Sequence, residues 1–316
     1  MPATIFLRRP LIVAVTLVAL CLACVSIGGT AGEVTQATPQ ATTRPAESNT
    51  THYGTARLMG TLANKAANES SGLAASTQAK GVFWTHNDSG DKPQVYAFNS
   101  KGEDLGTYTI KGARAFDWED MASFSLDGKS YLLLADTGDN GQVRKSVTLY
   151  IAPEPKLDPD RRGVIGETAV TTVIHFTYSD GPQDVEAVGV DTTTRGIYLV
   201  SKRGSRNVYE LPLPDSPPKE PLVAKKIAVL GLQMVTAMDI SPDGRRAVVL
   251  TYGPAFEYTR AANETWAQAF ARAGRRIPIP IRKQGESICY GLDGKTLYLT
   301  SEKLPTPLLE VPVEGQ

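Results

Sequence analysis

The chain has 316 residues, of which 41% are hydrophobic and 7% aromatic, an ordinary composition with enough apolar material for a core. Its 33 basic residues balance its 33 acidic residues, so no basic excess is available to neutralise phosphates, and a nucleic-acid partner is excluded. The 28 Gly and 21 Pro residues indicate many turns.

Residues 1–29 have the pattern of an export signal. Two adjacent arginines precede an apolar run over residues 11–27, and small residues follow. A small residue before Cys24 resembles a bacterial lipoprotein signal, although Cys21 stands where that pattern usually has Leu. Lipidation of Cys24, plain secretion and an uncleaved membrane anchor stay open, since the apolar run approaches the roughly 17 residues that span a bilayer. We expect an exported protein that contacts a membrane only through such an anchor.

Residues 30–54 are poor in large apolar side chains and rich in Thr, Ala and Pro. Such a segment cannot repay the entropy lost on ordering, so we expect a disordered tether before a folded domain at 55–316. Cys289 lies in an apolar strand and is expected to be a buried thiol. Because Cys21 and Cys24 belong to the signal, the core alone must hold the exported domain together.

The folded region contains an internal repeat. An acidic residue followed by an alternating strand recurs about every 50 residues, and a turn and a more hydrophobic strand follow each time. Most units add a third and a fourth strand, and three of the turns contain Asp-Gly. Four strands in about 50 residues is the spacing of a β-propeller blade.

We therefore predict an all-β fold, a five-bladed β-propeller of four-stranded antiparallel blades. The last unit has only three strands, and pairing it with Thr55–Leu62 would close the ring and remove an exposed edge. A sixth blade is possible if residues 146–183 hide another sheet, and a β-sandwich is the alternative architecture. Trp266 and Phe270, with Gly274 as a cap, indicate a helical insertion, which would pack on a sheet or cover one face as a lid.

The first strand of each propeller blade lines the central axis, so an acid at its start in every blade converges on one channel. The predicted ring comprises Glu69, Glu119, Glu186, Asp239 and Glu286. Carboxylates that face one another repel unless their pKa values rise or a cation binds, and Ca²⁺ takes six to eight oxygen ligands. The alternative is that some of these acids cap turns or pair with Arg114, Lys202 or Arg203.

Polar residues at the ends of the second strands supply further candidates. His86, Asp88 and Asp139 are possible general bases or ligands at the channel mouth, although a lone histidine is more often structural and both Asp residues lie in turn-forming sequences. Lys202 and Arg203 would bind an anionic substrate group or neutralise neighbouring acids.

The segments "WTHNDSGD", "DWEDMA", "ADTGDNG" and "YSDGPQDVEAV" resemble those of a largely uncharacterised family of secreted or lipid-anchored bacterial propeller proteins. The resemblance covers most of Glu69 to Lys303. More loosely, the acid-bearing inner strands are similar to those of calcium-dependent propellers such as regucalcin, paraoxonase and the phytase-like proteins. That looser resemblance implies a central metal and hydrolysis of a phosphoester or lactone.

We expect a monomeric binding or interaction module with a calcium-occupied acidic channel, whose partner is a small molecule or protein at the propeller face. The alternative is a metal-dependent hydrolase of the same fold. A water-accessible open coordination position beside a general base separates the two functions.

Overall fold

A computed structural model describes residues 51–158, 160–204 and 206–314. They belong to one compact unit, Asn49–Gln316. They form 21 strands and one short helix, which confirms the predicted all-β class. None of the described helical residues makes a helix long and apolar enough to cross a membrane. The predicted signal, with Cys21 and Cys24, lies outside the described residues.

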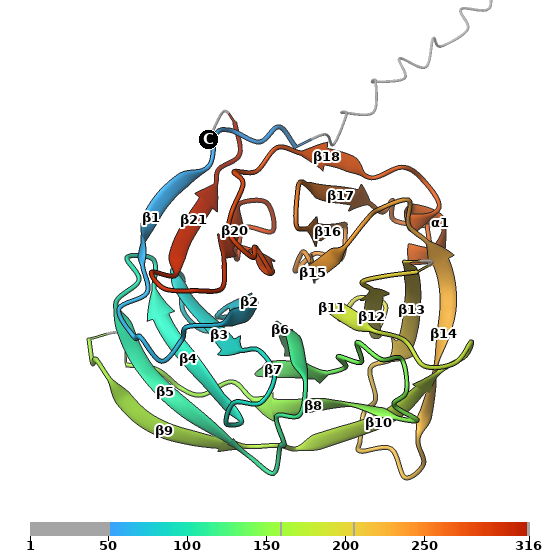
Figure 1. Cartoon of the computed structure of the whole chain (residues 1–316), viewed down its shortest axis with the longest axis horizontal. Coiled ribbons are helices and arrows are strands. Elements are labelled where there is room, and N and C mark those ends of the chain that lie inside the picture. The colour runs from blue at the N-terminus through green and yellow to red at the C-terminus, as the bar shows by residue number, and fades with distance from the viewer. Residues whose placement is uncertain (1–50, 159, 205, 315–316) are drawn as a thin grey trace, which may run out of the picture. The chain divides into compact units, whose positions relative to one another are not determined.

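Four hydrogen-bonded sheets surround a common centre (Figure 1). The first sheet runs outward from the centre through β2 (Ser70–Ala75), β3 (Val82–Asn87), β4 (Gln94–Asn99) and β5 (Asp104–Lys111). A fifth strand, β9 (Val164–Ala169), pairs in parallel with β5 at its outer edge.

The second sheet joins two groups of four antiparallel strands. One group is β6 (Trp118–Leu126), β7 (Lys129–Asp136), β8 (Val147–Pro153) and β10 (Thr172–Tyr178). The other is β11 (Val185–Asp191), β12 (Gly196–Ser201), β13 (Asn207–Pro212) and β14 (Leu222–Val229). Their outermost strands, β10 and β14, pair in parallel. Residues 146–183, considered as a sixth blade, thus contribute β8, β9 and β10 to two neighbouring sheets and make no sheet of their own.

The remaining sheets have four strands each. One is β15 (Val235–Ile240), β16 (Arg246–Thr251), β17 (Ala255–Thr259) and β18 (Arg275–Ile277), and the other is β19 (Ser287–Tyr290), β20 (Leu297–Thr300), β21 (Pro307–Val311) and β1 (Arg57–Thr61). The antiparallel pairing of β1 with β21 confirms the predicted closure by the N-terminal strand.

Residues 51–54, expected at the end of the tether, lie against the C-terminal segment. Tyr53 forms a β-bridge with Val313, and its hydroxyl donates to Glu257 at 2.6 Å. Thr51 is buried and accepts a hydrogen bond from Arg246. The ordered domain therefore includes residues before the predicted boundary at 55.

The first strand of each group lies at the centre. β2, β6, β11, β15 and β19 contact one another in that order, and β19 contacts β2. Apolar clusters fill the space between successive groups, and one of them joins Ala122 and Leu133 to Val188 and Leu199. This ring of sheets is propeller-like and differs from the two facing layers of a β-sandwich.

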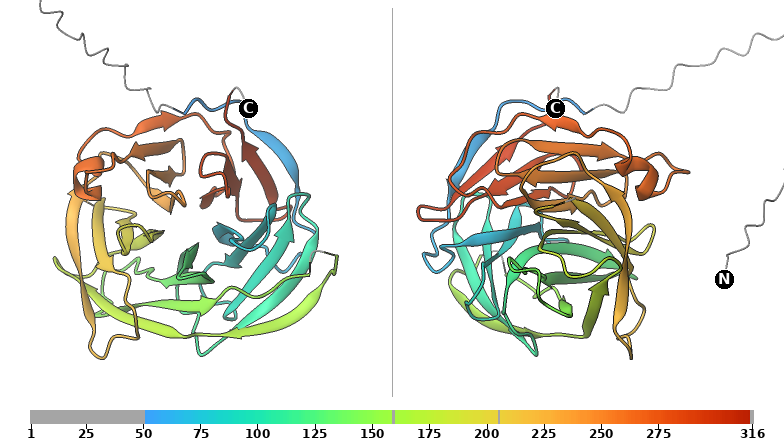
Figure 2. Two further views of the ribbon diagram at one scale, coloured as in Figure 1. Left: turned by 180° about the vertical axis from the view of Figure 1, so that it is seen from behind. Right: turned by 45° about the vertical axis from the view of Figure 1, so that its right-hand side comes forward.

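The short helix α1 (Trp266–Phe270) begins after Thr265, whose side chain forms a capping box with Gln268. It ends at Ala271 and not near Gly274. Its buried face packs on β14 and β17 at the outer rim, as Figure 2 shows from behind. The helix therefore packs on the sheets, as one of the two alternatives predicted, and does not cover the centre.

Candidate metal centre

Glu119 and Glu186 are directed by the same backbone irregularity. The pairing of β6 with β7 shifts at Glu119, and the pairing of β11 with β12 shifts at Glu186. A β-bulge of this kind leaves one residue outside the ladder and redirects its side chain. Both glutamates are buried, so rigid inner strands hold two carboxylates at the same end of the ring.

Asp117 stands two residues before Glu119, in the segment that leads into the same strand. The loop after β7 comes so close that a Cβ atom on Gly138 would collide with Asp117 Oδ2 and Glu119 Oε1. Glycine, which lacks that atom, leaves both carboxylates in place, whereas a larger residue would force them to move.

Asp184 stands two residues before Glu186 in the next inner strand. Its Oδ1 accepts the backbone N–H of Asp139 at 3.1 Å. Its Oδ2 is buried, accepts no hydrogen bond among the described residues, and lies 3.9 Å from Arg203 Nε. A buried carboxylate oxygen with such a distant partner retains a lone pair for a cation.

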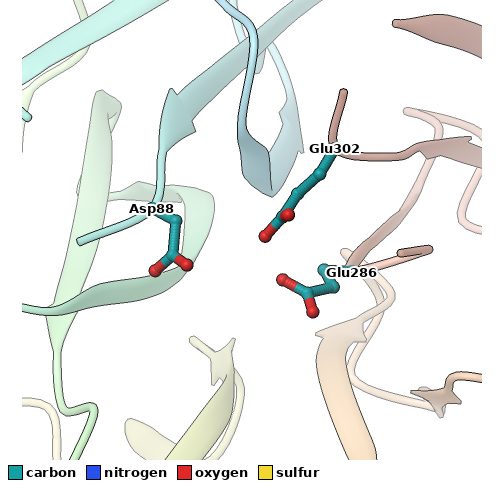
Figure 3. Close-up of side chains that lie close together, drawn as sticks. All are labelled: Asp88, Glu286 and Glu302. Atoms are coloured by element: carbon teal, nitrogen blue, oxygen red, sulfur yellow. The ribbon is translucent and has the colours of Figure 1, made fainter. Parts of the chain in front are cut away.

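Three further acids come from the first and last sheets. Asp88 follows β3, Glu302 follows β20, and Glu286 precedes β19. Figure 3 shows their carboxylates pointing toward one shared space. The Tyr252 hydroxyl donates to Glu286 Oε1, which fixes the orientation of that carboxylate.

These acids form three groups, and within each group one oxygen from each residue lies within 4.8 Å of the others. The groups share Asp88 and Glu119 and together make the acidic cluster: Asp88, Asp117, Glu119, Asp184, Glu186, Glu286 and Glu302. Carboxylate oxygens at such spacing suit Ca²⁺, a hard cation with oxygen ligands. The residues present therefore fit the ion that the sequence pattern predicted.

Cations offset only part of this charge. Lys202 Nζ lies 2.5 Å from the Glu186 carboxylate and 5.4 Å from the centroid of the Tyr252 ring. Lys303 Nζ lies 3.5 Å from Glu302. Arg203 lies near Asp184 and Arg144 acts on Asp117, so four cations among the described residues face seven acids, and the acidic cluster has an excess of negative charge when all its members are ionised.

The pKa values reflect this crowding. Burial, and then the nearby Glu186, raise the pKa of Glu119 well above its ordinary value. Burial, and then a hydrogen bond with Glu286, raise the pKa of Glu302 to about 8. Burial also raises the pKa of Glu186 to about 8, although Lys202 opposes the shift. Without a cation, part of the acidic cluster is protonated at neutral pH.

Two predicted ring members lie elsewhere. Glu69 is partly exposed, lies 3.5 Å from Lys303, and belongs to none of the carboxylate groups found among the described residues. Asp239 is farther along its strand: in β15 the bulge falls at Thr236, which occupies the position of Glu119 and Glu186. The carboxylate of Asp239 accepts backbone N–H groups of Ile240 and Tyr290, both at 2.8 Å, and burial raises its pKa to about 7.

Asp120, adjacent to Glu119, has a structural place in the same strand. Its Oδ2 accepts the backbone N–H groups of Val188 at 2.9 Å and Met238 at 3.1 Å, and its Oδ1 accepts that of Met121 at 2.8 Å. One fully buried side chain thus connects β6, β11 and β15.

The three predicted general bases lie in different surroundings: His86 in the core, Asp139 in a turn and Asp88 in the acidic cluster. His86 is fully buried, its Nδ1 lies 2.8 Å from the Asn87 carbonyl oxygen, and its ring packs edge-on against Trp118. Burial lowers the pKa of His86 to about 4, so the ring is neutral at physiological pH. Asp139 accepts the backbone N–H groups of Val143 and Arg144 and orders a turn. Only Asp88 is in the acidic cluster.

Sequence reasoning missed three members of the acidic cluster: Asp117, Asp184 and Glu302. The signal for the first two was a repeated Asp-x-Glu in "DWE" and "DVE". Glu302 follows its second strand in "TSE", as Asp88 does in "THND".

No family model and no curated protein matches this chain. A gluconolactonase from Xanthomonas campestris has a similar structure with a TM-score of 0.44 and 12% identity, over 77% of this chain and 71% of that one. Raptor from Chaetomium thermophilum gives 0.39 and 10%, over 80% of this chain and 20% of that one. The structure of U3-55K has a TM-score of 0.39 and 10% identity, over 77% of this chain and 68% of that one. TM-scores and identities this low assign neither a family nor an activity.

Proposed function

We propose that this chain is an exported, five-bladed β-propeller whose acidic cluster binds calcium and which serves as a binding or interaction module. The proposal of export rests on the signal-like residues 1–29. It covers both a protein anchored by a lipid on Cys24 and a protein secreted without an anchor. The partner is a small molecule or protein at the face that carries the acidic cluster.

The blade count is supported by the order of strand pairing. Each inner strand, β2, β6, β11, β15 and β19, begins a run of consecutive antiparallel strands. The parallel pairing of β10 with β14 then links two blades at their rims, and β9 is an added outer strand. In this interpretation the last blade takes β1 as its outer strand.

The observation that supports calcium binding most strongly is that the three sets of neighbouring acidic residues overlap. Glu119 and Asp88 each belong to two of these groups of three, so the ligands form one continuous set and not three separate clusters. The bulges at Glu119 and Glu186 fix two of these carboxylates on rigid strands, and a site built on strands holds its geometry without reordering.

Calorimetric titration of chelator-treated protein with CaCl₂ tests the proposal. Wild type should bind calcium. Its melting temperature, measured separately, should be higher with calcium than in chelator, since a ligand in hundredfold excess over Kd adds about 2.7 kcal/mol of stability. Glu119→Gln should weaken binding, whereas Glu220→Gln, an exposed residue outside the acidic cluster, is the matched control. Absence of binding to wild type, with Glu119→Gln melting higher than wild type in chelator, would show that the acidic cluster holds no ion.

A second candidate function, a metal-dependent hydrolase of lactones or phosphoesters, is favoured by one observation. The Glu302 and Asp88 carboxylates lie beside each other in the acidic cluster, so one of them is placed to act as a general base next to an ion that the other acids hold. A bound metal ion would supply Lewis acidity. Turnover of such substrates with calcium, lost in Glu302→Gln and kept in Glu220→Gln, would support this function, and no turnover by wild type would exclude it for the substrates assayed.

A further inference from the structure

A cavity lies beside Glu302, next to the sheet formed by β19, β20, β21 and β1. It has a volume of about 390 Å³ and is formed by residues 280–283, the loop 301–305, and Pro307 and Leu309 of β21. Small-molecule sites range from about 300 to 1,000 Å³, so this cavity is large enough for a compact ligand. We call it the Arg282 pocket.

Arg282 has no carboxylate partner within ion-pair distance among the described residues. One hydrogen bond is formed, from Nη1 to the Thr300 carbonyl oxygen at 2.8 Å, while Nε is covered and has no acceptor. Burial lowers the pKa of Arg282 to about 10, and no carboxylate counteracts that shift. A covered guanidinium ordinarily has an anionic partner, because a desolvated charge without one is costly.

The charge of the pocket favours an anion. Arg282, Lys283 and Lys303 line it together with one acid, Glu302. Lys303 lies 3.5 Å from both Glu302 and Glu69, and Arg282 and Lys283 still leave the pocket with a net positive charge. This is the opposite sign from the neighbouring acidic cluster.

The walls of the pocket are apolar. Pro280, Ile281, Leu304, Pro305, Pro307 and Leu309 line it. Ile281 is 99% exposed and Leu304 is 47% exposed, and exposed apolar side chains that gather at one place mark a site for a ligand or partner. Aliphatic walls beside an unpaired guanidinium suit a ligand with an anionic head and an apolar tail.

We propose that the Arg282 pocket binds a small amphiphilic oxyanion, whose carboxylate or phosphate head pairs with Arg282 and whose short aliphatic chain lies on Ile281 and Leu304. A guanidinium presents donors in a fork that matches either head group. Glu302 lines both this pocket and the acidic cluster, but the anion site is argued from Arg282 and does not depend on the proposed function.

The test is calorimetric titration in chelator, so that loss of metal binding cannot affect the outcome. Octanoate and octyl phosphate provide the two head groups, octanol lacks the charge, and acetate lacks the tail. At least one of the charged octyl compounds should bind wild type more tightly than octanol and acetate. Arg282→Gln should weaken that binding at least about tenfold, because charge-assisted hydrogen bonds are lost, and Leu304→Asp should also weaken it.

Lys219→Gln, an exposed cation outside the pocket, is the matched control and should bind as wild type does. Failure of both charged compounds to bind wild type, octanol binding as tightly as they do, or unchanged affinity in folded Arg282→Gln would each overturn the proposal. If Arg282→Gln does not fold, Ile281→Asp decides, because that side chain is 99% exposed and does not support the core. Unchanged affinity in this variant also overturns the proposal.

Discussion

Replacement of Asp120 by Asn tests whether a single carboxylate holds three inner strands together. The Asp120 carboxylate accepts three backbone N–H groups, from Met121, Val188 and Met238. An amide of the same shape has one acceptor oxygen and one NH₂ group, so it cannot accept hydrogen bonds on both sides. If the Asn oxygen keeps the bonds to Val188 and Met238, its NH₂ group faces the N–H of Met121.

One buried donor left unpaired costs about 1–3 kcal/mol. Asp120→Asn should therefore lower the free energy of unfolding by about 2 kcal/mol, and Asp120→Ala, which removes all three acceptors, should lower it further. In a domain of this size the Asn variant should melt several degrees lower, since about 1 kcal/mol corresponds to roughly 2–4 °C for 150–250 residues.

Guanidinium chloride denaturation in chelator measures this free energy by linear extrapolation. Asp127→Asn is the matched control, because Asp127 is exposed in a turn with φ of 51°, which Asn tolerates. The control should lie within about 0.5 kcal/mol of wild type. An Asp120→Asn variant as stable as that control would refute the structural role of the three hydrogen bonds.

Three further predictions concern other parts of the protein. Burial raises the pKa of Asp239 to about 7, so the folded state binds this proton more tightly than the unfolded state does. The stability that this proton contributes is fully present below about pH 4 and is lost as the pH rises through 7. Denaturation at pH 5 and pH 8 should therefore show a larger fall for wild type than for Asp239→Asn, by about 3 kcal/mol, because about two pH units of the shift lie between pH 5 and pH 7; equal falls would contradict the shift. Gly138→Ala should reduce calcium affinity by at least about tenfold in calorimetry, since its Cβ collides with Asp117 and Glu119, and unchanged affinity would argue against calcium at those two residues. If Cys24 is lipidated, Cys24→Ser should move the protein from the membrane fraction to the soluble fraction on cell fractionation, whereas wild type already in the soluble fraction would point to plain secretion.

The strand pattern was predictable where it is local. Alternating apolar residues and Asp-Gly turns identified the inner strands, and the missing fourth strand of the last unit identified the partner of β1. The parallel pairing of β5 with β9 was not predictable, because nothing in "TAVTTVIHFTY" marks the break between β9 and β10. Such pairing depends on contacts between residues far apart in the chain.

The candidate site was predictable only in part, and the bulges explain why. Counting residues from strand starts placed Asp239 beside Glu119 and Glu186, whereas the ladder places Thr236 there. A displacement of three residues turned a presumed ligand into an acceptor for two backbone N–H groups. Glu119, Glu186 and Glu286 were identified because each stands at the start of its inner strand. The position of a bulge is set by pairing with the second strand, and composition does not encode it.

The pairing of β1 with β21 has a consequence for synthesis. Arg57 forms an ion pair with Glu310 at 2.8 Å, across a separation of 253 residues. During translation β1 therefore lacks its partner strand until residues 307–311 have been made. Closing so long a loop is slow relative to local hairpin formation. The backbone N–H and C=O groups of β1 therefore stay unpaired while the other sheets form. A chaperone that binds this segment would prevent it from pairing with another chain.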